Sequence, residues 1–409
     1  MEIKTKYQYT YFIYPYVVNE KKFDKYILQL LHNKNCKLKT FEQERDVNLY
    51  TYFLPKIRNY MFWSFDFNKS KIKQLEQFDD NMKAVLLSKY PCVIFEYNMK
   101  EDIQGKSDSD GIFFNIRKIE IICFNTGICF FNIKTTLDEN STLEDLCNFN
   151  YKFRDINSSV SKLKDFENIK IQTNAFKDVK GISKLIKEIA GNNVEAKDLN
   201  LDVNRFITYS YACIGQENWN DNVDEKLLEK EFLKYANLYP SEYNLGYFSE
   251  QTYKLEQSKY IKFAFNNIST VLITSDINTN NYTKLPDIYE TQYLYNYIYE
   301  LHKKIFLNKI DKEFKGNNNF NNVKEKFVEF VQNVWIEEIT NDNVGNELDK
   351  YWKKVLNIDK LFIKVKQKYD VIYKNANIEK TEKSNKWIVI VLIILAIINI
   401  FNCISILYK

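Results

Sequence analysis

Hydrophobic and polar residues follow three successive patterns along this 409-residue chain. Residues 1–284 mix short segments rich in β-branched and aromatic residues with amphipathic helical segments. Residues 285–386 carry apolar residues at helical spacing, and residues 387–408 are apolar almost throughout. These patterns predict an α/β or α+β domain (1–284), a helical stalk (285–386) and one C-terminal transmembrane helix (387–408).

The first 284 residues alternate between the two kinds of secondary structure. Strands are predicted where β-branched and aromatic residues gather, at Tyr7–Tyr14, Cys92–Tyr97, Ile112–Phe124, Ile128–Thr135, Phe206–Cys213, Tyr260–Phe265 and Val271–Thr274. Helices are predicted at Glu20–Leu31, Ser70–Leu87, Leu143–Phe153, Ile182–Ile189 and Glu225–Ala236. Asn125-Thr126-Gly127 reads as a hairpin turn, so the sheet is expected to be at least partly antiparallel.

The stalk region carries a 3.5-residue apolar repeat, which is typical of a helix packed along a coiled-coil seam. Its central positions are Tyr351, Val355, Ile358, Phe362, Val365 and Tyr369. Two interpretations stay open at this point. The helices pack on one another within one chain, or the seam joins copies of the chain in a bundle.

The segment Trp387–Tyr408 is predicted to cross a membrane. Its twenty-two residues would span about 33 Å as a helix, close to the ~30 Å of a bilayer core. Lys364–Lys386 carries seven Lys against three acidic residues, which predicts that the large domain is cytoplasmic and the helix single-pass in the inner membrane. Seven scattered Cys without CxxC spacing agree with a reducing compartment.

Four polar residues interrupt the apolar segment: Asn399, Asn402, Cys403 and Ser405. Three of them, Asn399, Asn402 and Cys403, share an arc of about 100° on a helix. Amide groups facing lipid would lose hydrogen bonds, so these side chains are expected to line a pore or a seam between copies of the chain. The alternative is that Asn402 and Ser405 only approach the far membrane interface.

The sequence offers little catalytic chemistry. His32 and His302 both lie in helical patterns, and no metal-protease, P-loop or dinucleotide motif appears. The Asp108–Gly111 segment resembles part of a calcium loop without its end ligands, and Glu195-Ala196-Lys197 matches a nuclease pair without an acidic partner. We therefore expect no enzyme, no cofactor and no metal site. The formal charge of +4 gives no support to direct nucleic-acid binding.

The arrangement resembles the CorA-type cation channels, and more closely their divergent bacterial relatives, some of which are linked to type III CRISPR systems. The likeness lies in the Tyr-rich segment Tyr289–Tyr299 and in Phe327–Val334, Ile339, Gly345, Tyr351 and the charged heptads up to Lys386. The Gly-Met-Asn motif of that family and its second transmembrane helix are absent. The resemblance implies a homopentamer gated by its soluble domain, with a nucleotide second messenger as the ligand and membrane disruption as the antiviral output.

Two functions follow as expectations. The first is an oligomeric membrane channel or effector, which has the lipid bilayer, other copies of itself and a nucleotide second messenger as partners. The second is a tail-anchored cytosolic binding module without conduction. Neither the composition nor the spacing of residues identifies the ligand-binding side chains.

Overall fold

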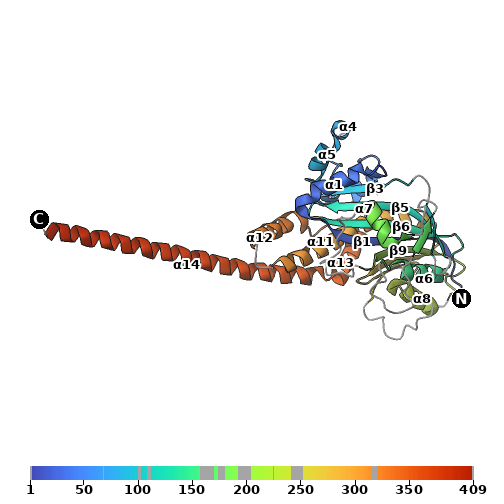
Figure 1. Cartoon of the computed structure of the whole chain (residues 1–409). Coiled ribbons are helices and arrows are strands. Elements are labelled where there is room, and N and C mark those ends of the chain that lie inside the picture. Colours follow the sequence, from blue (N-terminus) through green and yellow to red (C-terminus); the bar gives the residue numbers. More distant parts are fainter. Residues whose placement is uncertain are drawn as a thin grey trace.

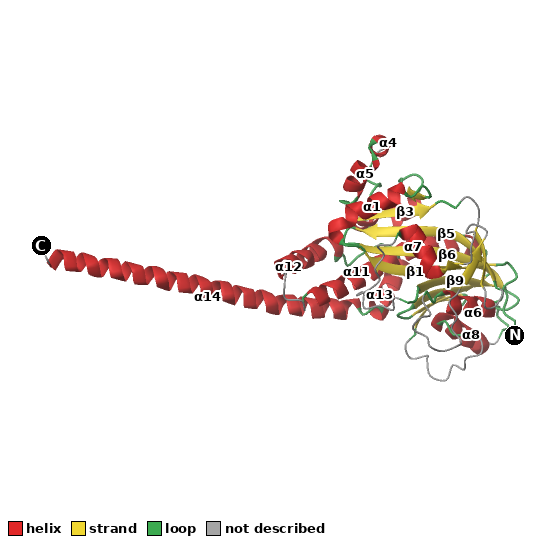
Figure 2. Cartoon of the chain, in the orientation of Figure 1, coloured by secondary structure: helices red, strands yellow, loops and turns green. Residues whose placement is uncertain are grey.

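The computed structural model describes residues 2–67, 69–99, 103–107, 112–156, 170–173, 180–191, 204–223, 225–240, 252–314 and 320–407. Its centre is one mixed sheet with helices on both faces, and a long helix leads away from this body (Figures 1 and 2). The mixed α/β class expected from the sequence is therefore present in the described part of the chain.

The sheet joins twelve described strands in the order β10-β11-β12-β9-β1-β6-β5-β4-β7-β8, with β3 on β5 and β2 on β3. All the pairs are antiparallel except β9 with β12. The strands are β1 Thr5–Val17, β2 Cys36–Leu38, β3 Cys92–Tyr97, β4 Ile103–Ser107, β5 Phe113–Phe124, β6 Ile128–Leu137, β7 Lys170–Thr173, β8 Lys180–Gly181, β9 Ile207–Ile214, β10 Tyr253–Ser258, β11 Ile261–Phe265 and β12 Ser269–Ser275.

The two faces of the sheet bury separate cores because successive strand residues point to opposite sides. Phe12 of β1 belongs to the first core, and Ile13 belongs to the second. The first core is covered by α1 Phe23–His32, α4 Lys69–Gln77, α5 Asp80–Leu87, α6 Leu143–Phe153, α7 Ile182–Ala190 and α8 Glu225–Asn237, with the short 3-10 helix η1 Glu20–Lys22 before α1.

The second face is covered by the helices that follow in the C-terminal third, together with α2 and α3. The central one is α11, whose residues are almost all buried between the sheet and its neighbours. These elements are α2 Val47–Tyr52, α3 Pro55–Met61, α9 Asn280–Thr283, α10 Leu285–Ile288, the π-helix η4 Tyr289–Tyr293, α11 Leu294–Glu313, α12 Phe320–Glu329, the π-helix η5 Phe330–Val334, α13 Asn343–Val355 and the start of α14 Ile358–Leu407.

Strand β1 passes through Pro15 and ends three residues beyond the predicted strand Tyr7–Tyr14. Pairing of β1 with β9 ends at Ile13, while pairing with β6 continues past Pro15, which lies opposite Phe130. Proline lacks a backbone N–H, so it fits where one neighbouring strand has already ended. The hairpin turn between β5 and β6 is as predicted: Gly127 has φ +78°, and a Cβ there would clash with the Val18 carbonyl oxygen.

Helix α14 carries the predicted membrane segment, and its C-terminal end forms the far tip of the molecule (Figure 1). Among the described residues no helix is both long and apolar enough to cross a membrane. This finding contradicts the predicted transmembrane helix Trp387–Tyr408 and the single-pass inner-membrane location that was based on it.

Candidate functional site

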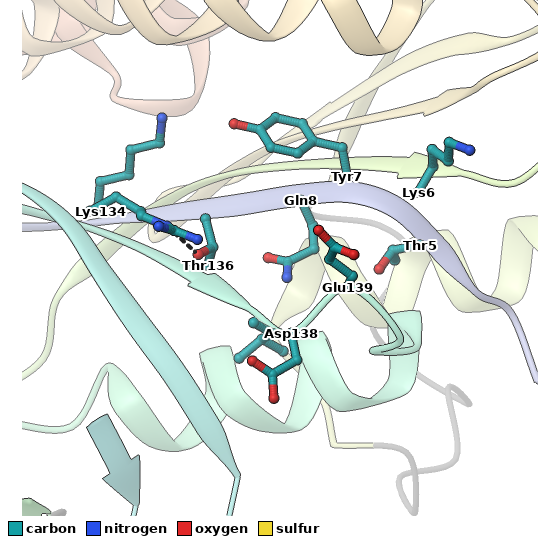
Figure 3. Close-up of a pocket in the computed structure, with 10 residues that line it drawn as sticks. Thr5, Lys6, Tyr7, Gln8, Lys134, Thr136, Asp138 and Glu139 are labelled. Carbon is teal, nitrogen blue, oxygen red and sulfur yellow. Dashed lines mark hydrogen bonds between the residues drawn. The ribbon is translucent and has the colours of Figure 1, made fainter. Parts of the chain in front are cut away.

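The sheet opens between β1 and β6 near the start of β1. The two strands pair from Thr10 opposite Thr135 to Val17 opposite Ile128. Beyond Thr10 they separate, and the chain segments meet again at an isolated bridge between Lys4 and Thr142. A pocket of about 300 Å³ lies in this interval, lined by residues 5–8, Arg117, Lys134 and residues 136–139 (Figure 3).

The local sequence explains why the strands separate. Strand β6 ends at Leu137, and Thr142 then caps α6 in a capping box with Asp145. The Ser141 N–H donates to the Asp138 carbonyl at 3.0 Å, which forms a turn that leads residues 138–141 from strand into helix. On its other side β1 stays paired with β9 down to Thr5, so the strand remains extended along the opening.

Both faces of β1 contribute to the pocket, because Tyr7 and Gln8 leave the strand on opposite sides (Figure 3). The Tyr7 ring is 37% exposed and packs against the rings of Tyr9 and Tyr211, at centroid distances of 6.0 and 6.2 Å. Burial, and then the charge of Glu290, raise the pKa of the Tyr7 phenol, so it stays a hydrogen-bond donor at neutral pH.

Gln8 is a buried polar group of the pocket that lacks, within the described residues, a partner for one of its atoms. Its side chain is 4% exposed, and its Oε1 has no hydrogen-bond partner among the residues that the structure describes. An unsatisfied buried acceptor of this kind costs about 1–3 kcal/mol. A ligand N–H or O–H that reached this amide would remove that cost.

Charges of both signs surround the opening. Lys6, Arg117 and Lys134 are cationic, and Asp138 and Glu139 are acidic and exposed. Arg117 lies at a register shift of β5, between Ile116 and Lys118, and its Nε donates to Thr136 Oγ1 at 3.1 Å. Such bulges redirect a side chain out of the regular alternation, which explains how Arg117 reaches the pocket.

Lys134 is held by the helical layer behind the sheet. Its ammonium pairs with the Glu290 carboxylate and lies 4.5 Å from the centroid of the Tyr9 ring. The Tyr11 hydroxyl donates to the same carboxylate at 2.6 Å. Burial raises the pKa of Glu290, but Lys134 and Lys118 lower it by more, so the group stays ionised. Glu290 belongs to η4, and π-helical turns are frequent at functional sites.

A second charged cluster lies deeper, between β5 and α11. The fully buried Glu120 pairs with Lys39 at 2.7 Å and with Lys118 at 3.1 Å, and the Tyr295 hydroxyl donates to it at 3.1 Å. Burial raises the pKa of Glu120, but the two lysines outweigh this effect and lower the pKa to about 2. We assign this cluster to fixing the sheet on α11, because Glu120 is inaccessible to a ligand.

The predicted stalk residues contact other parts of their own chain. Val355, Ile358 and Val365 are buried in the second core. The partly buried residues stack on rings of the body: Tyr351 on Phe265 at 5.0 Å, Phe362 on Trp335 at 3.9 Å and Tyr369 near Phe327 at 5.1 Å. The contacts are intramolecular, and a seam between copies of the chain stays a prediction.

The other predicted site residues give no second cluster. The side chains of Asn399, Asn402, Cys403 and Ser405 lie outside the described residues, as do residues 108–111 and 195–197. His32 is exposed on α1, whereas His302 is fully buried on α11. Within the described part of the chain, no group of three or more His, Cys, Asp or Glu side chains could hold a metal ion.

Comparisons with known proteins do not identify a family for this chain. No family model, no curated protein and no solved structure matches the chain. The resemblance to the CorA-type channels therefore stays a prediction, and the function is argued from the residues of the pocket.

Proposed function

We propose that this chain is a binding module, without conduction, for a small phosphorylated ligand of nucleotide size in the opening between β1 and β6. Of the two functions expected from the sequence, the channel needs a helix that crosses a membrane. The tail anchor expected of the binding module needs one too, but ligand binding by its soluble domain does not, and a nucleotide ligand was part of the expectation. The observation that carries the proposal is the pocket, with its mixed charges and with a Gln8 Oε1 that has no hydrogen-bond partner in the described protein.

The size of the pocket supports one small ligand. A volume of about 300 Å³ is at the lower end of the ~300–1,000 Å³ that is usual for ligand pockets. A single nucleotide is of this order, whereas a polymer would need a groove that continues along the surface.

Each part of a nucleotide has a complementary group at this opening. Lys6 and Arg117 provide the positive charge that a phosphate requires, since Lys134 is already paired with Glu290. The partly exposed Tyr7 ring offers a surface for stacking of a base. The carboxylates of Asp138 and Glu139 are acceptors for ribose hydroxyls, and the Gln8 amide is a partner for the polar edge of a base.

The test compares AMP, adenosine and inorganic phosphate by isothermal titration calorimetry on the full chain. AMP should bind tightest, because it alone uses both the charged and the aromatic parts of the pocket. Replacing Lys6 with Met should weaken AMP binding at least about tenfold and leave adenosine binding unchanged, since a charged hydrogen bond is worth ~1.5–3 kcal/mol.

The matched control is Lys25→Met, on an exposed lysine of α1 that does not line the pocket. It should bind AMP like the wild type. Equal affinity for AMP and adenosine, or no binding of any of the three compounds, would refute the proposal. Tight binding of inorganic phosphate with no gain from the nucleoside part would reduce the site to an anion site.

A second observation favours self-association of the module. Residues Trp387–Leu395 are consecutive large apolar side chains, and each is 46–68% exposed on a helix that leads away from the body. Exposed apolar patches of this kind are typical of interaction sites. We propose that α14 of a second copy covers them, in agreement with the homo-oligomer expected from the sequence.

A further inference from the structure

A second pocket lies at the other end of strands β5 and β6, beside their hairpin turn. Its volume is about 360 Å³. The turn contributes Asn125 and Thr126, α3 contributes Tyr60, α11 contributes Phe306, and η5 contributes Phe330. The first pocket lies at the opposite ends of the same two strands, so the two sites share no lining residue.

The apolar wall of this second pocket is aromatic. Phe306 and Phe330 stack on each other at a centroid distance of 4.8 Å and an interplanar angle of 9°, and both are buried. Pro91 and Val334 extend the wall. A flat ring placed against these side chains would bury apolar surface on its face and edges, as aromatic pairs prefer.

Tyr60 supplies a polar atom that has no partner. The side chain is 7% exposed and lines the pocket, and its hydroxyl has no hydrogen-bond partner among the described residues. The rings of Phe124, Tyr299 and His302 surround it at centroid distances of 6.1, 5.7 and 6.1 Å. A buried hydroxyl group among aromatic rings destabilises the fold unless an acceptor receives its hydrogen bond.

Thr126 is oriented from behind by a buried histidine. Its Oγ1 lies 2.9 Å from His302 Nε2, and His302 stacks on Phe124 at 3.9 Å. Burial, and then the charges of Lys303 and Lys309, lower the pKa of His302 to about 3, so the ring is neutral. The histidine therefore positions the threonine hydroxyl without bringing charge to the pocket.

Two opposite charges lie at the mouth of the pocket. Lys89 and Glu329 both line the pocket, both are exposed, and neither has an ion pair within the described part of the chain. Glu20 and Lys326 also line it, but these two already pair with each other at 3.0 Å. A ligand with one ammonium and one carboxylate would complement the first two groups.

We propose that this pocket binds a zwitterionic aromatic compound of the size of an aromatic amino acid. The ring lies against Phe306 and Phe330, and an acceptor on the ring receives the hydrogen bond of the Tyr60 hydroxyl. The ammonium and the carboxylate meet Glu329 and Lys89. The site differs from the nucleotide-size pocket in both its residues and its ligand class.

The experiment uses L-tyrosine and L-phenylalanine, which differ only by the hydroxyl that Tyr60 would meet. Isothermal titration calorimetry on the full chain should show that L-tyrosine binds about 5–10-fold tighter than L-phenylalanine, since one neutral hydrogen bond is worth ~1 kcal/mol. In Tyr60→Phe this preference should disappear. The variant should keep the wild-type unfolding midpoint, because the hydroxyl that it loses has no partner in the described protein.

Two further variants test the charges at the mouth. Glu329→Gln should weaken both amino acids severalfold, while Glu325→Gln, on an exposed residue of the same helix that does not line the pocket, should weaken neither. Lys6→Met, at the first pocket, should also leave both affinities unchanged. The proposal fails if wild type binds neither amino acid at millimolar concentration, if the preference for L-tyrosine persists in Tyr60→Phe, or if Glu329→Gln binds like wild type.

Discussion

Two stretches of helix α14 contain the same kinds of residue in opposite surroundings. At its start, Ile358 and Val365 are fully buried, and Phe362 stacks on Trp335. Asp311 of α11 also pairs there with Lys364 and Lys368. Further along, every side chain of Trp387–Leu395 is about half exposed. One continuous helix thus has a base fixed by the body and an apolar segment that the described part of the chain leaves uncovered.

The difference shows what an apolar pattern specifies. An apolar pattern indicates that the side chains are stabilised by burial away from water, but it does not specify which surface covers them. At the base of α14 the surface is α11, α12 and the η5 region of the same chain. Further along, no described residues cover the apolar side chains, and the sequence analysis predicted that a bilayer surrounds them.

The largest expected effect comes from placing a charge at the base of the helix. Val365→Asp should lower the free energy of unfolding by about 3–5 kcal/mol, because it buries an unpaired carboxylate. Val371→Asp on the same helix should change it by less than about 0.5 kcal/mol, since Val371 is 58% exposed.

Chemical denaturation of the two variants, followed by circular dichroism, measures both values. If the two substitutions lower the free energy of unfolding equally, the base of α14 and its exposed part do not differ as proposed. Equal small costs would mean that the base of α14 detaches from the body in solution. Equal large costs would mean that Val371 is covered by another copy of the chain.

The covered region also differs in how its carboxylates titrate. Glu300 of α11 is fully buried and pairs with Lys303 at 2.6 Å, yet burial outweighs this partner and raises the pKa of Glu300 to about 7. A carboxyl group whose folded-state pKa is raised binds a proton more tightly when folded. Its contribution to stability is therefore present at low pH and is lost as the pH rises from about 4.5 to 7.

Glu300→Gln should remove this slope, which for the wild type amounts to roughly 3 kcal/mol over that interval. Asp370→Asn, on an exposed residue of α14, should keep the wild-type slope. The measurement is the free energy of unfolding at a series of pH values between 4 and 8. A slope in Glu300→Gln equal to that of wild type would show that another group titrates in this range.

Elements with a strong local pattern could be predicted from the sequence. The hairpin of β5 and β6 followed from alternating residues and from Gly127, and α6 is found at Leu143–Phe153 as expected. The short helices α2 and α3 were missed, because six or seven residues give too little periodicity to recognise. The predicted helix Ser70–Leu87 is two helices, since Asp79 caps a new start with its side chain.

The candidate pocket had no local signal. Its walls come from residues 5–8 and 134–139, which are brought together by strand pairing across more than a hundred positions. Lys6, Tyr7 and Gln8 lie in what reads as the start of an ordinary strand, and the separation of β1 from β6 depends on where α6 is capped. Information of this kind lies in the register of the sheet, which residue spacing along the chain does not encode.

The smallest expected effect on stability is at the uncovered segment, where the effect on assembly should be largest. Ile390 and Ile394 lie four residues apart, on one side of α14, and both are about half exposed. Replacing both with Glu should weaken self-association at least about tenfold, because an apolar contact between copies would then bury charge. The free energy of unfolding should change by less than about 0.5 kcal/mol, since no described part of the chain covers these residues. The matched control replaces Ile363 and Val371 with Glu. Both residues are also exposed on α14 but lie outside the segment Trp387–Leu395. Light scattering over a range of protein concentrations should give a higher mass for wild type and the control than for the Ile390→Glu, Ile394→Glu variant.

A wild type with the mass of one chain at all concentrations would refute the proposed self-association. If the control lost mass as much as the test variant, copies of the chain would instead meet along the length of α14.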